Sequence, residues 1–271
     1  ALMSLRLTNF IKAHAYGNDF LFIDEGTVSA DDAAGIATRI CHRHSGVGAD
    51  GLIFYRITAA GAAMKLFNAD GSVAEVSGNG VRCLAAIVAD DDEVRGETVI
   101  ESDGGIKVLK LLKAVPPRYT FRAFMGAPIG LQETELDVTG ERVRVVVMSV
   151  GNPQCIVLTD RLDEARFRRL GPALATHEVF PDGTNVEFVQ VERSDRAKML
   201  IWERGVGPTS SSGTGACASA VAASAFGGAS RSLDVVSPGG SQHVDWRDDG
   251  IYLTGWAEIT VRGEWFVEDQ L

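Results

Sequence analysis

Two serine residues stand at the start of glycine-rich segments and are the first candidates for chemistry. Ser77 precedes GNGVRCLAA, and Ser212 precedes GTGACASA. The free N–H groups and the dipole of a helix N-terminus attract a carboxylate or another anion. A serine at such a place is also an ordinary helix N-cap. The two segments therefore indicate either a pair of anion-binding helix starts or a pair of structural caps.

The two glycine-rich segments belong to an internal repeat of about half the chain. SGNG begins at position 77 and SGTG at 212, and 212 minus 77 is 135. SDGG at 102 and SPGG at 237 are also 135 positions apart, and GND at 17 and GNP at 151 are 134 apart. One short match would carry little weight, but three in nearly one register indicate a duplicated domain. The two serines thus fall at equivalent places in two copies.

Each copy is expected to combine short strands with two helices. Apolar residues at helical spacing and capping signals predict the helices, and β-branched and aromatic residues predict the strands. The expected helices are 31–44, the part of 78–91 that follows its glycines, 162–177 and 213–226, and the expected strands include 51–57, 142–150, 184–191 and 251–256. The segment 213–226 is apolar or small nearly all round, which predicts burial on every side.

These elements predict an α/β (α+β) fold of two pseudo-symmetric domains, each a curled β-sheet around a central helix. The adjacent prolines Pro116 and Pro117 interrupt the pattern and indicate the boundary. We expect an N-terminal domain of residues 3–116, completed by a C-terminal strand at 260–271, and a second domain of residues 117–259.

Composition and charge restrict the class of partner. The formal net charge of -10 opposes binding to nucleic acid and to anionic membrane surfaces, because both would require a basic patch. No apolar run reaches the roughly 18 residues of a membrane span. The four cysteines form no CxxC pair, and the N-terminal segment does not resemble a signal peptide. We expect a cytoplasmic protein whose partners are small molecules.

Three other chemical interpretations are disfavoured. GVGADG at 46–51 fits G-x-G-x-x-G, but a helix is expected before it and a strand after it, the reverse of a dinucleotide-binding unit, and no P-loop sequence occurs. Cys41, His42 and His44 end a helix without a second ligand pair, so no metal is expected. Serine hydrolysis would need a base beside the serine, and the G-x-S-x-G elbow is absent.

The chain as a whole resembles the pyridoxal-independent diaminopimelate epimerase family. The resemblance is carried, in the family's order and approximate spacing, by AYGNDFLFID, GVGADGL, FNADGSVAEVSGNGVRC, GNPQC, GTNVEFVQV and WERGVGPTSSSGTGACA. It implies two pseudo-symmetric α/β domains with the active site in the cleft between them, a homodimer, and no cofactor or metal. It also implies that diaminopimelate, an intermediate of lysine synthesis, is isomerised by two bases that work on opposite faces of the α-carbon.

The resemblance also implies the site residues. Both bases are cysteines in the typical family member, and Ser77 and Ser212 stand at their positions here. Glu203 would hold the reacting amine or steer a base, and Gln154 stands where the family has an assisting histidine. The implied substrate-binding residues are Asn18, Asn68, Asn152, Asn185 and Arg204, together with Gly78, Asn79, Gly213 and Thr214, whose amides would receive the α-carboxylate. The planar guanidinium of Arg204 suits a bidentate carboxylate contact.

The two serines change what the site is expected to do. A thiol at a helix N-terminus can ionise near neutral pH, whereas a serine hydroxyl is a far weaker acid that needs another base. Cys83 and Cys217 lie further along the expected helices, where they are expected to be core residues. Three functions fit: a diaminopimelate epimerase with impaired or altered bases, a related isomerase or dehydratase of another amino acid, and a non-catalytic amino-acid binding protein.

Overall fold

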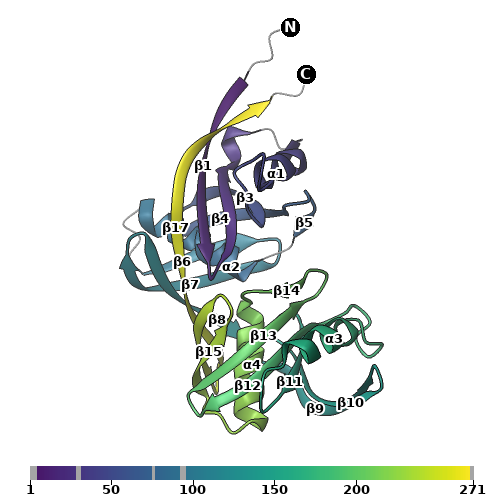
Figure 1. Cartoon of the computed structure of the whole chain (residues 1–271). Coiled ribbons are helices and arrows are strands. Elements are labelled where there is room, and N and C mark those ends of the chain that lie inside the picture. Colours follow the sequence, from purple (N-terminus) through teal and green to yellow (C-terminus); the bar gives the residue numbers. More distant parts are fainter. Residues whose placement is uncertain (1–4, 29–31, 75–76, 92–95, 269–271) are drawn as a thin grey trace. The chain divides into compact units, whose positions relative to one another are not determined.

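The computed structural model describes residues 5–28, 32–74, 77–91 and 96–268, which form two compact units (Figure 1). Unit 1 contains the chain up to Phe121 and again from Trp256, and unit 2 contains Arg122–Gly255. Strands β8 (Arg118–Gly126) and β17 (Gly250–Glu268) each pass from one unit to the other. The domain ranges expected from the sequence are 3–116 with 260–271 and 117–259. The division between the units lies five residues later than expected at Phe121 and four residues earlier at Gly255.

Unit 1 is a mixed β-sheet with two α-helices. Strand β1 pairs antiparallel with both β2 and β17, so the first and last strands are neighbours, and Leu5 lies opposite Glu268. The elements in chain order are β1 (Leu5–Ala15), β2 (Asn18–Asp24), the 3-10 helix η1 (Glu25–Thr27), α1 (Ala33–Cys41), β3 (Gly51–Thr58), β4 (Gly61–Asn68), β5 (Val73–Ala74), α2 (Gly78–Asp91), β6 (Glu97–Ser102) and β7 (Gly105–Val115).

Unit 2 is also a mixed β-sheet with two α-helices. Its elements in chain order are β9 (Ile129–Val138), β10 (Glu141–Ser149), β11 (Pro153–Leu158), α3 (Glu164–Ala175), β12 (Asn185–Arg193), β13 (Arg196–Glu203), β14 (Gly207–Thr209), α4 (Gly213–Phe226), β15 (Ser232–Ser237) and β16 (Gly240–Arg247). The first part of β17 pairs antiparallel with β16 and completes this sheet.

The two units repeat one order of strand pairing. In unit 1 the pairs β1–β2, β2–β3, β3–β4, β4–β6 and β6–β7 are antiparallel, parallel, antiparallel, parallel and antiparallel. The pairs β10–β11, β11–β12, β12–β13, β13–β15 and β15–β16 of unit 2 follow the same order. Phe20 lies opposite Gly51 as Gln154 lies opposite Asn185, and 154 minus 20 and 185 minus 51 are both 134. The expected duplication and the mixed fold are confirmed.

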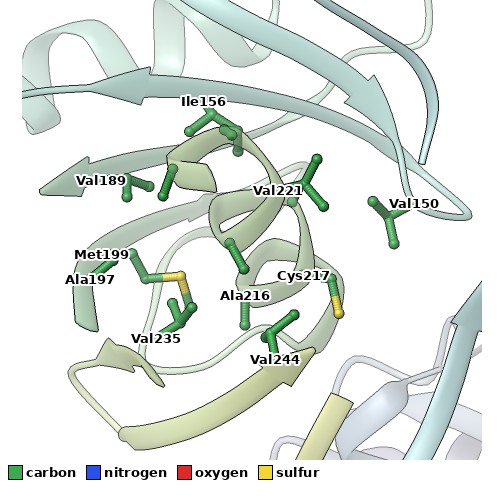
Figure 2. Close-up of a cluster of buried hydrophobic side chains, with 14 of the residues drawn as sticks. Val150, Ile156, Val189, Ala197, Met199, Ala216, Cys217, Val221, Val235 and Val244 are labelled. Carbon is green, nitrogen blue, oxygen red and sulfur yellow. The ribbon is translucent and has the colours of Figure 1, made fainter. Parts of the chain in front are cut away.

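Helix α4 is buried on every side from Gly215 to Ala223, as its composition predicts, and its last residues Ala225 and Phe226 are exposed. Cys217 and Val221 of α4 belong to a cluster with Ile156 of β11, Val189 of β12 and Met199 of β13 (Figure 2). Strands β11, β12, β13, β15 and β16 all contact the helix. Because α4 carries mostly alanine, glycine and serine, the strands approach it closely and surround it. Unit 2 therefore has the expected curled sheet around a central helix.

The remaining helix of each unit, α1 or α3, covers the face of the sheet opposite the central helix. Phe167 of α3 packs on Val186 of β12, whereas Val189 of the same strand packs toward α4. In unit 1 the central helix is α2, which contacts β1, β2, β4, β6 and β7. Ile36 of α1 packs with Leu52 of β3 in a separate cluster. Each sheet thus lies between a central glycine-rich helix and an outer amphipathic helix.

The helix bounds follow from local signals. Helix α4 has the expected bounds, 213–226, whereas α2 begins at Gly78 and so includes the glycines after which the sequence predicts it to begin. Helix α1 is shorter than the expected 31–44, whose first residue lies outside the described residues, and it ends where His42 adopts an extended backbone. Helix α3 begins after Asp163, whose carboxylate accepts a hydrogen bond from the Arg166 N–H. Among the described residues, no helix combines the length and the apolar character needed to cross a membrane.

Candidate active site

Ser77 caps helix α2 in unit 1. Its Oγ accepts a hydrogen bond from the backbone N–H of Gly80 at 3.2 Å, the contact expected of an N-cap serine. The N–H groups of Gly78 and Asn79 belong to the first helical turn, where the helix itself offers no acceptor. Gly78 is exposed, and a Cβ at this position would meet no atom within 4 Å. The start of α2 is therefore accessible to an anion.

A chain of hydrogen-bonded side chains lies beside the start of α2. Asn79 Nδ2 donates to Asn18 Oδ1 at 3.1 Å, and Asn18 Nδ2 donates to Asp50 Oδ2 at 2.7 Å. The buried Arg82 donates to Asn79 Oδ1 at 3.3 Å, and Arg43 donates to Asp50 Oδ1 at 2.8 Å. These contacts fix the orientation of both asparagine amides.

A second carboxylate, Asp19, ties this chain to the sheet. Lys12 Nζ lies 3.0 Å from Asp19 Oδ2, and Arg43 donates to Asp19 Oδ1 at 2.9 Å. Burial acts to raise the pKa of Asp19, but the hydrogen bonds from Arg43 and Lys12 bring the pKa below its ordinary value. Asp19 is therefore ionised at neutral pH, and two carboxylates face two cations behind the amides.

Asn68 lies at the same end of the sheet but makes local contacts. It is the last residue of β4 and pairs with Gly51 of β3, which pairs in turn with Phe20 of β2. Its Nδ2 donates to Ser72 Oγ at 3.0 Å rather than to Asn18. Unit 1 therefore brings Asn18, Asn79 and Ser77 together around one helix start and places Asn68 two strands away from Asn18.

Ser212 occupies in unit 2 the place that Ser77 occupies in unit 1. Its Oγ accepts from the Gly215 N–H at 3.0 Å and lies 3.5 Å from Thr214 Oγ1. Gln242 of β16 donates to the Ser212 carbonyl oxygen at 3.3 Å, which anchors the residue from a neighbouring strand. Gly213 is buried and Thr214 half-buried in the same first turn. The two helix starts are thus built alike.

Polar side chains lie beneath the first turn of α4. Gln154 of β11 is 1% exposed, and its Nε2 donates to Asn152 Oδ1 at 2.7 Å and to Thr214 Oγ1 at 3.2 Å. The other end of this amide lies 3.1 Å from both carboxyl oxygens of Glu187, which is 0% exposed. We call Gln154 and Glu187 the polar floor of α4. Burial, and then the charge of Glu203, raise the pKa of Glu187 well above its ordinary value.

Asn185, Glu203 and Arg204 lie where β12 begins and β13 ends. Asn185 Oδ1 accepts from the Arg204 backbone N–H at 2.9 Å, and Arg204 Nη1 donates to the carbonyl oxygen of Asp182 at 2.9 Å. Beside them is a hollow of about 560 Å³ lined by Phe180, Asp182, Trp202, Arg204, Gly205 and Gly207, among others. Arg204 thus lines a hollow and binds the backbone of Asp182 through its guanidinium.

All four cysteines are buried and none lies at a helix start. Burial raises the pKa of the Cys41 thiol to about 12 and raises those of Cys83 and Cys155 as well. Cys217 is a member of the apolar cluster around α4. These thiols are core residues, as expected for Cys83 and Cys217, and none replaces the missing thiolate.

The hydrogen bonds of His42 and His243 bear on the two alternative interpretations of the sequence, a metal site and a serine hydrolase. His42 Nδ1 accepts from the Ser45 N–H at 3.0 Å and so helps to turn the chain after α1. Within the described ranges, no three His, Cys, Asp or Glu side chains gather as a set of metal ligands. The histidines that hydrogen-bond to serine there are His42 with Ser45 and His243 with Ser232, so neither Ser77 nor Ser212 has the partner of a hydrolase.

Sequence reasoning missed several residues that hold the predicted ones. Asp50 lies within GVGADG, where the glycines form the recognisable pattern, and it orients Asn18. Glu187 lies in the strand NVEFVQV, where a single carboxyl among apolar residues was the available signal. Arg82 had no distinguishing signal, because an arginine in a predicted helix is usually exposed.

Comparison with known proteins gives a consistent family. The family model described as diaminopimelate epimerase matches residues 10–127 and 146–260. The diaminopimelate epimerase of Desulfitobacterium hafniense (strain DSM 10664 / DCB-2) is 38% identical over 280 residues, covering 96% of this chain and 99% of its own. That of Desulforudis audaxviator (strain MP104C) is 40% identical over 274 residues, covering 94% and 98%.

Solved structures share the fold at low sequence identity. A Bacillus anthracis phenazine biosynthesis protein of the PhzF family has a TM-score of 0.71 and 14% identity, covering 97% of this chain and 100% of its own. A hydroxyproline epimerase from Agrobacterium vitis, solved with bound trans-4-hydroxy-L-proline, has a TM-score of 0.67 and 15% identity, covering 98% and 93%. At these identities the likeness concerns the fold.

Proposed function

The chain belongs to the diaminopimelate epimerase family, and from that premise we propose that it interconverts LL- and meso-diaminopimelate by exchanging the proton on one α-carbon. This activity serves lysine biosynthesis. The observation that supports it most is the matched pair of helix starts. In each unit a serine at the base position accepts a hydrogen bond from the N–H three residues further on.

Ser77 and Ser212 hold the two base positions in this proposal. One removes the α-proton and the other delivers a proton to the opposite face. The N–H groups of Gly80 and Gly215 stabilise negative charge on the serine oxygens, as helix N-termini do for anions. A hydroxyl is nonetheless a far weaker acid than a thiol. We therefore expect slow proton exchange, with Glu203 steering a base or holding the reacting amine and Gln154 hydrogen-bonding in place of an assisting histidine.

The other predicted residues hold the substrate. The α-carboxylate is received by first-turn amides, which carry unsatisfied donors and the positive end of the helix dipole. The distal carboxylate suits Arg204, which lines the hollow beside β13 and whose guanidinium carries five N–H donors. The proposed substrate-binding residues are Asn18, Asn68, Gly78, Asn79, Asn152, Asn185, Arg204, Gly213 and Thr214.

The proposal includes the setting of the reaction. It takes place in the cytoplasm, on a homodimer, without pyridoxal phosphate and without a metal. Buried, widely spaced cysteines suit a reducing compartment. Light scattering of the purified protein tests the dimer. Proton exchange that survives a chelator and a carbonyl-trapping reagent would agree with a cofactor-free reaction, and its loss with either reagent would count against it.

Proton NMR of LL-diaminopimelate in deuterium oxide tests the activity. The protein is compared with the double variant Ser77→Cys and Ser212→Cys, and loss of the α-hydrogen signal is followed. We expect rapid exchange with the double variant and slow exchange with the serine protein. Exchange by neither protein, at a substrate concentration that saturates binding, would contradict the proposal.

Amino-acid binding without turnover is the second candidate. It is favoured by one observation: both base positions carry serine, and all four thiols of the chain are buried. This function predicts that calorimetry detects binding of diaminopimelate to the serine protein while NMR detects no exchange. Measurable exchange by the serine protein would eliminate it.

A further inference from the structure

Glu187 is a fully buried carboxyl placed directly under the first turn of α4. It is 0% exposed, and the other buried residues of its strand are Asn185 and the apolar Val186, Phe188 and Val189. A Cβ at Gly215 would lie only 2.5 Å from Glu187 Oε1, so the glycine leaves the room that the carboxyl occupies. The same Cβ would lie 3.0 Å from Ser212 Oγ. Glu187 and Ser212 therefore face the same glycine.

The surroundings of Glu187 do not favour a negative charge. Glu203 of β13 is the charged group that acts on it, and Cys155 of β11 is a neutral buried thiol. The N–H of Gly215, the glycine that faces the carboxyl, is donated to Ser212 Oγ. An unpaired ionised carboxyl in such a place is costly, and such groups take up a proton instead. The raised pKa of Glu187 agrees with this argument.

The charge of Glu187 decides how the Gln154 amide is oriented. An ionised carboxyl would require Nε2 at the end that lies 3.1 Å from its oxygens. The amide oxygen would then accept from Asn185 Nδ2 and Thr214 Oγ1, each at 3.2 Å, but would lie 2.7 Å from Asn152 Oδ1, an acceptor. A protonated carboxyl donates to Oε1 instead. Nε2 then donates to Asn152 Oδ1 at 2.7 Å and to Thr214 Oγ1 at 3.2 Å. This second arrangement keeps the 2.7 Å hydrogen bond to Asn152, the shortest contact of the amide. Asn185 Nδ2 lies 3.2 Å from the Nε2 end of the amide and must therefore donate to another acceptor.

We propose that Glu187 is a positioning residue that stays protonated, donates to Gln154 Oε1 and so directs a series of hydrogen bonds toward Ser212. Gln154 Nε2 donates to Thr214 Oγ1, and the Thr214 hydroxyl is then the donor in its 3.5 Å contact with Ser212 Oγ. Ser212 Oγ accepts from both Thr214 and Gly215 and keeps its own hydrogen for the ligand. The effect on Ser212 rests on the proposed function, whereas the protonation of Glu187 does not.

Infrared difference spectroscopy at neutral pH tests the protonation directly. The spectrum of the unsubstituted protein minus that of Glu187→Gln should contain the carbonyl band of a carboxylic acid, shifted in deuterium oxide. Glu192→Gln is the matched control. Glu192 lies on the same strand, where hydrogen bonds from Lys198 and Arg196 lower its pKa. The difference spectrum of Glu192→Gln should therefore contain the bands of an ionised carboxylate. Carboxylate bands in the Glu187 difference spectrum would overturn the proposal, whether or not the protein is active.

Calorimetric titration with diaminopimelate tests the positioning role. Glu187→Gln retains an N–H donor toward Gln154 Oε1, so its affinity should stay within about twofold of the starting value. Glu187→Ile frees the amide and should weaken binding by about tenfold, in the range of one misdirected hydrogen bond. Equal loss in both variants would show that the carboxyl charge is needed and would overturn the positioning role. If no variant binds, the proposed function fails, and the infrared result still decides the protonation of Glu187.

Discussion

The two units place different residues under equivalent helix starts. Beneath α4 lie Gln154 and Glu187, and the corresponding positions of unit 1, 134 residues earlier in the same strand register, are Phe20 and Ile53. Ile53 is 0% exposed, and its Cδ1 is the atom that a Cβ at Gly80 would meet, at 2.9 Å. An apolar floor therefore suffices to support a serine-capped helix. The polar floor of α4 is a chemical difference between the copies, since the cap geometry does not require it.

The largest expected effect comes from exchanging the serines for cysteine. Ser77→Cys with Ser212→Cys should raise the rate of α-proton exchange by about 10² to 10⁴-fold, the usual contribution of a competent acid or base. Each single variant restores one base, so each should exchange the proton of a different stereoisomer. NMR in deuterium oxide with LL- and meso-diaminopimelate separates the two. Identical preferences in both single variants would contradict opposite roles for the two units.

Alanine substitutions at the equivalent glycines Gly215 and Gly80 should show how much added volume the residues beneath each helix start tolerate. Gly215→Ala places a methyl group 2.5 Å from Glu187 Oε1 and should lower the free energy of unfolding by about 2 kcal/mol, a typical cost of overpacking. Gly80→Ala should cost less, because the Ile53 side chain can turn aside and alanine favours the helix. Urea unfolding measures both. An equal or larger loss in Gly80→Ala would mean that the floors do not differ in tolerance.

Converting the polar floor into the apolar one tests whether the pair acts as a unit. Gln154→Phe and Glu187→Ile each leave a buried polar group without its partner and should each cost about 1–3 kcal/mol of unfolding free energy. The double variant carries the residues of unit 1 and should cost less than the two single losses together. A double-mutant cycle from urea unfolding gives the coupling. Simple additivity would show that Gln154 and Glu187 are independent.

The pH dependence of stability should reveal the raised pKa of Glu187. Its folded pKa lies above the ordinary 4.5, so its contribution is complete below pH 4.5 and is lost as the pH rises through the folded value. The unsubstituted protein should therefore lose stability relative to Glu187→Gln over this range, by at most about 1.4 kcal/mol per pH unit. Urea unfolding at several pH values provides the measurement. Parallel curves for the two proteins would contradict a raised pKa.

Sequence reasoning recovered the repeat and the two central helices because both depend on local signals. Glycine and serine define the starts of α2 and α4, and Gly227 follows the last residue of α4. The polar floor could not be predicted this way. Gln154 and Glu187 meet only because β11 and β12 pair in parallel, and that register follows from packing of the whole sheet. Asp50 could not be predicted for a similar reason, since it lies just before β3 and contacts Asn18 of β2.

The pairing of β1 with β17 has a mechanical consequence. The strands are antiparallel, and Leu5 and Glu268 lie opposite each other at one end of the ladder. A pulling force applied to the two chain ends would therefore load one pair of hydrogen bonds at a time and open the strands like a zipper. The shift of register between Lys12 and Ala13 interrupts that ladder further along. Held by its ends, the protein should yield first at these strands and at low force.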